Sequence, residues 1–145
     1  MAITLEQVNN SNYEAVCDLE VTDEQQHYVA SNMWSLVESH YNQGYTCRAI
    51  YRDGELVGFF MWVLESPVKV SIWRFMVDKC YQQTGIGRAA LALALREIKA
   101  AKQLKEIEIC YHPHNPVVKD FYSSFGFQEV GLDEEGEDML AIIKL

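Results

Sequence analysis

The clearest pattern in the chain lies between residues 73 and 102, where an apolar run gives way to a helical repeat. Residues 72–77 are almost all apolar or aromatic, which is typical of a strand buried on both faces. Apolar residues then recur between Leu91 and Ile98 at helical spacing, with charged residues on the opposite side. The pattern predicts a central strand, a short polar turn and a long amphipathic helix.

The other elements follow from alternation, capping signals and turns. Strands are expected at 3–8, 46–52, 56–64, 106–111, 127–131 and 138–143. Short helices are expected at 13–19 and from Asn115 to Gly126, where Asn is a good cap and Pro116 suits the first helical position. Asp53-Gly54 is a strong hairpin turn signal.

A longer helix is expected to begin at the capping box formed by residues 22–25 and to end by Gly44. The residues expected on its inner face are Val29, Met33, Leu36 and Val37. The predicted order of elements is β α α β β β α β α β β, without a repeat, linker or low-complexity segment.

The polar turn after the central strand has the composition of a phosphate-binding loop. Residues 82–87 place two glycines at a helix start, where unpaired N–H groups and the positive dipole end favour phosphate. Residues 85–90 also fit the dinucleotide fingerprint G-x-G-x-x-[GA], with Glu106 about 20 residues on. A polar segment separates these glycines from the strand, however, and only one further helix follows residue 102, which argues against that reading. A P-loop is excluded because no Lys-Ser/Thr pair follows the glycines.

The loop resembles the acyl-CoA loop of the GNAT acyltransferase family, [QR]-x-x-G-x-[GA], because Gln82, Gly85 and Gly87 fill its defined positions. A surface turn that only caps a core helix is the plain alternative. Residues 115–127 resemble a second family segment, N-x-x-(A/V)-x-x-(F/L)-Y-x-x-x-G-F. The chain departs from the family at Gln83-Thr84, where Gly-Lys is common, so that a positive charge is missing.

Two further stretches, 73–82 and 26–36, are similar to the bacterial spermine/spermidine (diamine) acetyltransferase branch of the family. The resemblance covers the whole chain. It implies an α+β GNAT fold, with a mixed, mostly antiparallel central sheet of about seven strands flanked by four helices. It also implies acetyl-CoA as cosubstrate and a homodimer.

Length, composition and charge narrow the class of protein. A chain of 145 residues with 49% hydrophobic residues suits one compact domain spanning 1–145. A formal net charge of −9 argues against a nucleic-acid partner and suits cationic substrates. No apolar run reaches transmembrane length and the N-terminus lacks a signal pattern, so neither a membrane partner nor secretion is expected. The four scattered cysteines then indicate reduced thiols in a cytoplasmic protein.

The resemblance assigns a cofactor role to two segments and to one asparagine. The central strand would splay at its end and pair with the pantetheine amides, the N–H of Val77 being the donor to the thioester oxygen. The loop would bind the pyrophosphate through its backbone, with Arg88 adding charge, and Asn115 would bind the pantetheine arm. The predicted cofactor-binding residues are Phe75, Met76, Val77, Gln82, Gln83, Thr84, Gly85, Ile86, Gly87, Arg88 and Asn115.

Tyr122 is the predicted catalytic residue, as the acid that protonates the CoA sulfur. It also belongs to an apolar stripe with Val118, Phe121 and Phe125, so a core role is the alternative. Asn115 could likewise be only a helix cap, and Arg88 an ordinary exposed residue. No Glu or His lies in the central strand to act as general base. Glu65, Asp78 or water remain candidates.

Acidic and aromatic residues before or within the central strand are the candidates for an amine-binding site. The predicted substrate residues are Glu24, Trp34, Glu38, Glu65 and Trp73. Each has a simpler interpretation, as a solvated helix face or as core. The segment from Cys110 to His114 contains metal-ligand types but has no second cluster, so no metal is expected.

The sequence thus predicts an N-acetyltransferase that moves an acetyl group from acetyl-CoA to a small primary amine, with a polyamine favoured. Direct attack by the amine suffices, because no cysteine has evident nucleophile partners. Two alternatives stay open. The acceptor could be an amino acid, an aminoglycoside or a protein N-terminus, or the chain could be a non-catalytic acyl-CoA sensor.

Overall fold

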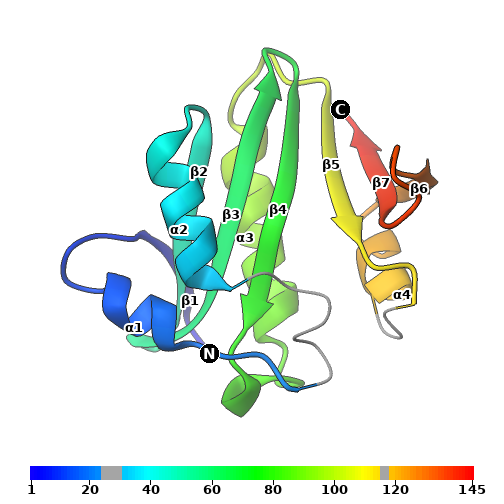
Figure 1. Cartoon of the computed structure of the whole chain (residues 1–145). Helices are drawn as coiled ribbons and strands as arrows, with labels where there is room; N and C mark the ends of the chain where they lie inside the picture. The colour runs from blue at the N-terminus through cyan, green and yellow to red at the C-terminus, as the bar shows by residue number, and fades with distance from the viewer. Residues whose placement is uncertain (24–30, 115–117) are drawn as a thin grey trace.

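The computed structural model describes residues 1–23, 31–114 and 118–145. Seven strands form one sheet in the order β1-β2-β3-β4-β5-β7-β6 (Figure 1). All neighbours pair antiparallel except β4 and β5, which are parallel. The strands are β1 Ile3–Gln7, β2 Tyr45–Arg52, β3 Glu55–Ser66, β4 Lys69–Val77, β5 Glu106–Tyr111, β6 Gln128–Leu132 and β7 Met139–Lys144. The predicted mixed, mostly antiparallel sheet is therefore confirmed.

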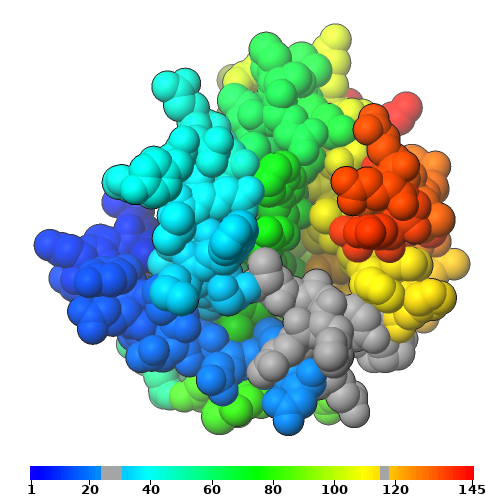
Figure 2. Space-filling view, in the orientation of Figure 1, coloured from blue at the N-terminus to red at the C-terminus, as the bar shows by residue number. Residues whose placement is uncertain are grey.

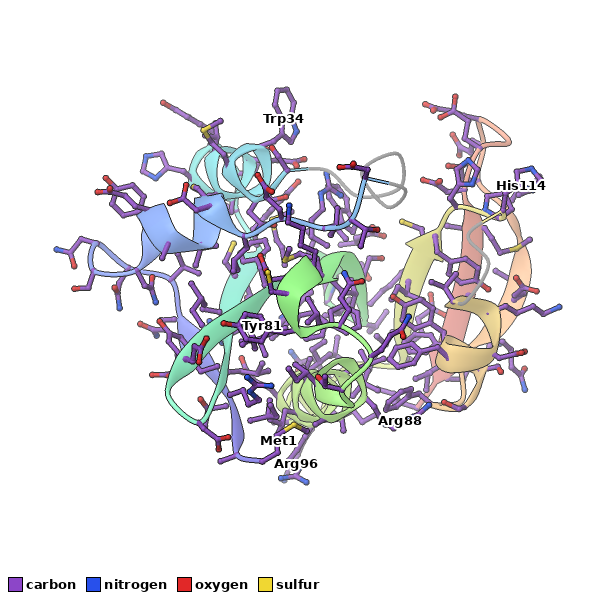
Figure 3. The ribbon with its side chains drawn as sticks, turned by 90° about the horizontal axis from the view of Figure 1, so that it is seen from below. Met1, Trp34, Tyr81, Arg88, Arg96 and His114 are labelled. Carbon is purple, nitrogen blue, oxygen red and sulfur yellow. The ribbon has the colours of Figure 1, made fainter. Side chains whose placement is uncertain are left out.

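Helices cover both faces of this sheet. The described helices are α1 Tyr13–Asp18, α2 Asn32–Tyr41, α3 Ile86–Lys99 and α4 Val118–Ser123, with a short 3₁₀ turn at Lys79–Tyr81. Helices α1 and α2 lie on one face, over β2 and β3, and α3 and α4 lie on the other (Figures 1 and 3). The face under α1 and α2 is called the α2 face below, and the opposite one the α3 face.

The hairpins form where the turn signals predicted them. Asp53 and Gly54 both have positive φ, 50° and 83°, as the two-residue turn between β2 and β3 requires. Strands β3 and β4 extend closer to the turn at Pro67 than the sequence suggested. Helix α3 buries the expected stripe, including Leu91, Ala94, Leu95 and Ile98.

The predicted inner face of the second helix is wrong at two of its four positions. Leu36 is partly buried and packs against the α2-face core, and Val29 lies outside the described residues. Met33 and Val37 are 62% and 53% exposed, while Asn32 and Ser35 are buried. Helix α2 is capped by Ser31, whose hydroxyl accepts from the Trp34 N–H. Asn32 can face inward because its side-chain amide donates to Val16 O, 2.9 Å away. A satisfied polar residue thus takes the position that the apolar pattern assigned to its neighbour.

The central strand is less buried than its sequence suggested. In β3, Phe59, Phe60 and Met61 are wholly buried, whereas β4 is only half-buried from Trp73 to Phe75. The reason is that β4 keeps β3 as a neighbour throughout but loses β5 halfway along. This loss of pairing leaves one edge of β4 open over residues 73–77.

Candidate functional site

Strand β4 has an unpaired edge over residues 73–77, called the open edge below. The β4–β5 ladder runs from Lys69–Glu106 to Ile72–Ile109 and ends there. Beyond that point β5 continues to Tyr111 but pairs only with β7. In Figure 2 a furrow with part of β4 at its floor separates α2 from β5 and the strands beyond it. The splay predicted at 75–77 is therefore present and starts slightly earlier.

The hydrogen-bond register directs specific groups to this open edge. The Asp78 N–H donates to Val57 O, 2.8 Å away, so Asp78 bonds toward β3. In an antiparallel pair the bonding direction alternates, and Val77 and Phe75 therefore point their backbone groups away from β3. The Val77 carbonyl accepts from Gln82 Nε2 at 2.9 Å. The Val77 N–H thus faces the open edge, as a donor to a thioester oxygen must.

The loop before α3 presents backbone rather than side chains. Gln83 and Gly85 both adopt positive φ, 62° and 86°, and Gly85 is the helix N-cap. The Thr84 hydroxyl donates back to Tyr81 O at 2.7 Å, which fixes the turn. No side chain caps the helix start, so the N–H groups of Ile86 to Arg88 point out of the first turn. This geometry suits a phosphate, and it explains why glycine occupies position 85.

Arg88 joins the helix start to α4 (Figure 3). Its guanidinium lies 5.3 Å from the Phe121 ring centre and 5.1 Å from that of Phe125, and it donates to Ser124 Oγ at 3.1 Å. Arg88 is exposed, so its charge remains accessible beside the loop. These three contacts fix the side chain but do not by themselves separate a cofactor role from a structural one.

Tyr122 belongs to α4, on the α3 face of the sheet. It lies near the place where β4 and β5 separate. It is 8% exposed and stacks on Tyr111, with ring centres 5.5 Å apart. Its neighbour Phe121 packs against Phe75 of the open edge, 6.3 Å between ring centres. Burial raises the pKa of Tyr122, so the hydroxyl stays protonated at neutral pH. No described residue hydrogen-bonds that hydroxyl, whereas the Tyr111 hydroxyl donates to Glu129 Oε2 at 2.6 Å. Tyr122 is thus a core residue whose hydroxyl keeps its proton at neutral pH.

On the α2 face, a bulge in β4 aims two consecutive side chains the same way. The β3–β4 register shifts between Met61 and Trp62, which leaves Trp73 as the extra residue. Trp73 packs against the α2-face core, and Arg74 lies 3.6 Å from Glu38 of α2, measured from Nη2 to Oε1. Arg74 Nη1 donates to its neighbour's carbonyl at 2.8 Å. A charged residue is thereby held beside the open edge.

Two carboxylates and two aromatic rings gather around this bulge. The Trp73 indole N–H donates to Glu65 Oε1 at 3.3 Å, and the ring meets Tyr45 edge-on at 5.5 Å. Burial, and then the charge and hydrogen bond of Glu38, raise the pKa of Tyr45. Together, Glu38, Tyr45, Glu65 and Trp73 form a group that we call the acceptor box. Carboxylates beside aromatic rings are suited to alkylammonium groups.

The candidate general bases are already engaged in other contacts. Asp78 accepts from the backbone N–H groups of Glu20 and Cys80, at 2.9 and 3.0 Å. Glu65 contacts Trp73 and, at 3.5 Å, Lys69. Burial raises the pKa of Cys110 to about 11, so this thiol is neutral and a poor nucleophile near pH 7. The structure therefore favours direct attack by the amine.

The predicted site residues do not all come together. Trp34 is 64% exposed and points away from the sheet (Figure 3), so it does not meet Trp73. Met76 is buried on the α2 face, where it packs in the core. Glu24 and Asn115 lie outside the described residues.

Sequence reasoning missed Tyr45 and Arg74. A charge inside an apolar strand was a signal for Arg74, whereas nothing local marked Tyr45. In the described ranges, no group of three or more His, Cys, Asp or Glu side chains is arranged to hold a metal ion. None of the described helices is long and apolar enough to cross a bilayer.

Comparison with known proteins identifies the family. Residues 10–127 match the family model described as the acetyltransferase (GNAT) family. The chain belongs to the GNAT acetyltransferase family. It is also 30% identical to the spermine/spermidine N(1)-acetyltransferase of Bacillus subtilis (strain 168), with 97% of each chain covered.

Solved structures show the same fold. The spermidine N-acetyltransferase of Vibrio cholerae, in complex with CoA and spermine, matches with a TM-score of 0.80 at 17% identity, covering 98% of this chain and 95% of that one. The PaiA N-acetyltransferase of Thermoplasma acidophilum, in complex with coenzyme A, matches with a TM-score of 0.76 at 20% identity over the whole of both chains. The predictions of a GNAT fold and of an N-acetyltransferase are confirmed.

Proposed function

We propose that this GNAT protein transfers the acetyl group of acetyl-CoA to a primary amine of a polyamine such as spermidine or spermine. The observation that carries the proposal is the open edge of β4, which lies between a phosphate-type helix start, a buried tyrosine and an acidic, aromatic box. Each of these features matches one requirement of amide formation from a thioester.

Binding of acetyl-CoA is assigned to backbone groups. The N–H groups from Gln83 to Arg88 would hold the pyrophosphate, and Arg88 would add local charge in an acidic protein. The Phe75–Val77 edge would pair with the pantetheine amides, with Asn115 as a further contact. Two relatives form CoA complexes, which supports this assignment.

Catalysis then needs an oxyanion donor and an acid. The Val77 N–H would donate to the thioester oxygen as negative charge develops on it. Tyr122 would give its proton to the departing sulfur, because its raised pKa keeps the phenol protonated until the thiolate forms. The neutral amine attacks the carbonyl directly, the C–N bond forming as the C–S bond breaks. The proton lost by the amine leaves through water, and the phenolate left on Tyr122 regains a proton from water.

The acceptor is assigned from charge and from the relatives. Glu38 and Glu65, with Tyr45 and Trp73, offer carboxylates and ring faces to the ammonium groups of a polyamine. Trp73 lies four residues from Val77, roughly 13 Å along an extended strand. This span suits a molecule that reacts at one amine and is held at another. The named activity of the Bacillus subtilis relative supports a polyamine.

The setting of the enzyme is part of the proposal. We place it in the cytoplasm, as one domain over 1–145 acting as a homodimer without nucleic-acid or membrane partners. The net charge of −9 supports the exclusion of nucleic acid. The cysteines, all free within the described residues, are consistent with a reducing compartment.

A screen of amine acceptors tests the function. Release of CoA thiol from acetyl-CoA would be followed with spermine, spermidine, putrescine, amino acids, aminoglycosides and a peptide N-terminus. The proposal expects rapid release with the polyamines only. Turnover with another acceptor would refute the polyamine assignment, and tight acetyl-CoA binding without any turnover would favour the sensor.

A further inference from the structure

Arg88 lies where the loop before α3, the open edge and α4 meet. It is the third residue of α3, directly after Gly87. A Cβ added at Gly87 would lie 3.6 Å from Phe75 Cζ and 3.9 Å from Phe121 Cζ, so both rings pack against the helix start. Phe121 in turn lies 6.3 Å from Phe75 of the open edge, measured between ring centres. The helix start, β4 and α4 therefore meet at Phe121, and the Arg88 guanidinium lies over this ring.

The guanidinium of Arg88 contacts residues that precede and follow Tyr122 in the chain. It lies over the Phe121 ring, 5.3 Å from the ring centre, and over the Phe125 ring, 5.1 Å from its centre. The planes of these two rings meet at 62°. Arg88 Nη1 also donates to Ser124 Oγ at 3.1 Å. A planar guanidinium can make all three contacts at once, because its faces suit aromatic rings and its edge carries several N–H donors.

A chain of hydrogen bonds connects Arg88 to a peptide group of Tyr122. Ser124 Oγ accepts from Arg88 and donates to the Phe121 carbonyl at 2.6 Å. That carbonyl belongs to the peptide bond between Phe121 and Tyr122. The Tyr122 carbonyl, in the following peptide group, accepts from backbone N–H groups of the turn that ends α4. Both peptide groups of the proposed acid are thus held, and one of them is held through Arg88.

The position of the Tyr122 hydroxyl depends on this backbone. The ring is enclosed by Phe121, Tyr111 and Phe127, at 5.2, 5.5 and 6.0 Å between ring centres. No described residue hydrogen-bonds the hydroxyl, so the ring and the backbone place it. Helix α4 has six residues, too few to be stable without contacts to other elements. The contacts that hold α4 therefore also determine where the hydroxyl lies.

We propose that Arg88 is a positioning residue for Tyr122, in addition to supplying charge beside the loop. The inference rests on the proposed function, since it concerns the acid of that reaction. Proton transfer to the CoA sulfur requires the hydroxyl within hydrogen-bond reach. A misplacement of about 1 Å can cost about 100-fold in rate. Arg88 holds the Phe121–Tyr122 peptide against the helix start assigned to the pyrophosphate, and so fixes the hydroxyl relative to the bound cofactor.

A double-mutant cycle with Tyr122 separates positioning from charge and from general stability. Arg88→Lys keeps the positive charge but cannot stack on two rings and donate to Ser124 at the same time. It should lower kcat with acetyl-CoA and spermidine about fivefold. Acetyl-CoA affinity, from isothermal titration, should stay within about threefold. In the Tyr122→Phe background the same substitution should change kcat by less than about 1.5-fold, because the hydroxyl that Arg88 positions is already absent.

Two further variants are matched to this cycle. Ser124→Ala removes the hydroxyl that connects Arg88 to the Phe121 carbonyl and should lower kcat about threefold. In the Arg88→Lys background it should have less than about a 1.5-fold further effect, because the connection is already broken. Arg96→Lys makes the same chemical change later on α3, where the side chain is exposed (Figure 3). It should keep both kcat and acetyl-CoA affinity within about 1.5-fold of the wild type.

The outcomes separate this inference from the proposed function. Equal losses of kcat from Arg88→Lys with and without the Tyr122 hydroxyl would overturn the positioning role while the function stands. An unchanged kcat, or a loss of acetyl-CoA affinity in place of kcat, would overturn it too. Should Arg88→Lys fold poorly, Ser124→Ala measured with and without the Tyr122 hydroxyl decides in the same way. Absence of turnover by the wild-type protein with every polyamine would overturn the function itself, and the inference with it.

Discussion

The two sides of the open edge are built in different ways. On the cofactor side, the groups assigned to acetyl-CoA are mostly backbone groups. Their positions are set by Gly85, by the register of β4 and by the hydrogen bond from the Gln82 side chain to the Val77 carbonyl. On the acceptor side, they are side chains from α2, β2, β3 and β4, brought together by a bulge. The difference teaches that a backbone site is specified by a short segment of sequence, whereas a side-chain site depends on packing between distant segments.

The largest expected effect is a loss of acetyl-CoA affinity when Gly87, on the cofactor side, is replaced by a charged residue. A Cβ at Gly87 would lie 3.6 Å from Phe75 Cζ and 3.9 Å from Phe121 Cζ, which is ordinary contact. Gly87→Ala should therefore keep acetyl-CoA affinity within about threefold. Gly87→Glu needs more room, and its charge repels phosphate, so affinity should fall by more than about 100-fold. Isothermal titration with acetyl-CoA measures both, and unchanged affinity in Gly87→Glu would refute the pyrophosphate site.

The second prediction concerns the reactivity of the Cys110 thiol, in β5 where its pairing with β4 has ended. With a pKa raised by burial to about 11, Cys110 carries roughly 100-fold less thiolate at pH 8 than a thiol at its ordinary pKa of 9. Iodoacetamide should label it at least tens of times more slowly than the exposed Cys80. Peptide mapping by mass spectrometry reads the two rates. Equal rates would reopen an acyl-cysteine mechanism.

A smaller effect tests the acid. Tyr122→Phe should lower kcat at least about tenfold, since only the hydroxyl is lost, and leave acetyl-CoA affinity within about twofold. Tyr111→Phe is the matched control, because that ring stacks on Tyr122 but its hydroxyl is bound to Glu129. Its kcat should stay within about threefold of the wild type. Equal kcat in wild type and Tyr122→Phe would exclude the acid role.

The smallest expected effect is a change in KM for the amine, without a change in KM for acetyl-CoA, when Glu65 is replaced. Glu65→Gln should raise KM for spermidine about fivefold, because one carboxylate of the acceptor box is lost. KM for acetyl-CoA, and for a monoamine of the same length, should stay nearly unchanged. Glu137→Gln, in the exposed turn before β7, is the control for removing a negative charge. A uniform rise of KM for both amines would show that Glu65 does not contact the distal ammonium.

The predictable parts of the molecule are those with local causes. Asp53-Gly54 specifies its turn by backbone preference, and α3 buries the stripe that its repeat specifies. The loop and Tyr122 could be proposed as site residues because each lies in a short sequence pattern. The mixed, mostly antiparallel sheet follows from the family resemblance, and the structure and the family match both confirm the fold.

The other parts depend on contacts between distant segments. Met33 and Val37 are exposed because Asn32 finds the Val16 carbonyl, a partner outside its own helix. Arg74 is aimed at Glu38 by a bulge that only the pairing of β3 with β4 creates. Tyr45 becomes part of the acceptor box through Trp73 and Glu38, which are 28 and 7 residues away in sequence. No local pattern marks such residues in advance.

Analysis of the products formed from acetyl-CoA and spermidine tests the central claim most directly. Mass spectrometry would follow the polyamine while a thiol reagent counts released CoA, in the wild type and in Tyr122→Phe side by side. The account predicts one acetyl group added per CoA released, with the rate reduced at least about tenfold in the variant. Acetyl-CoA bound by the wild type but never consumed in the presence of spermidine would contradict it.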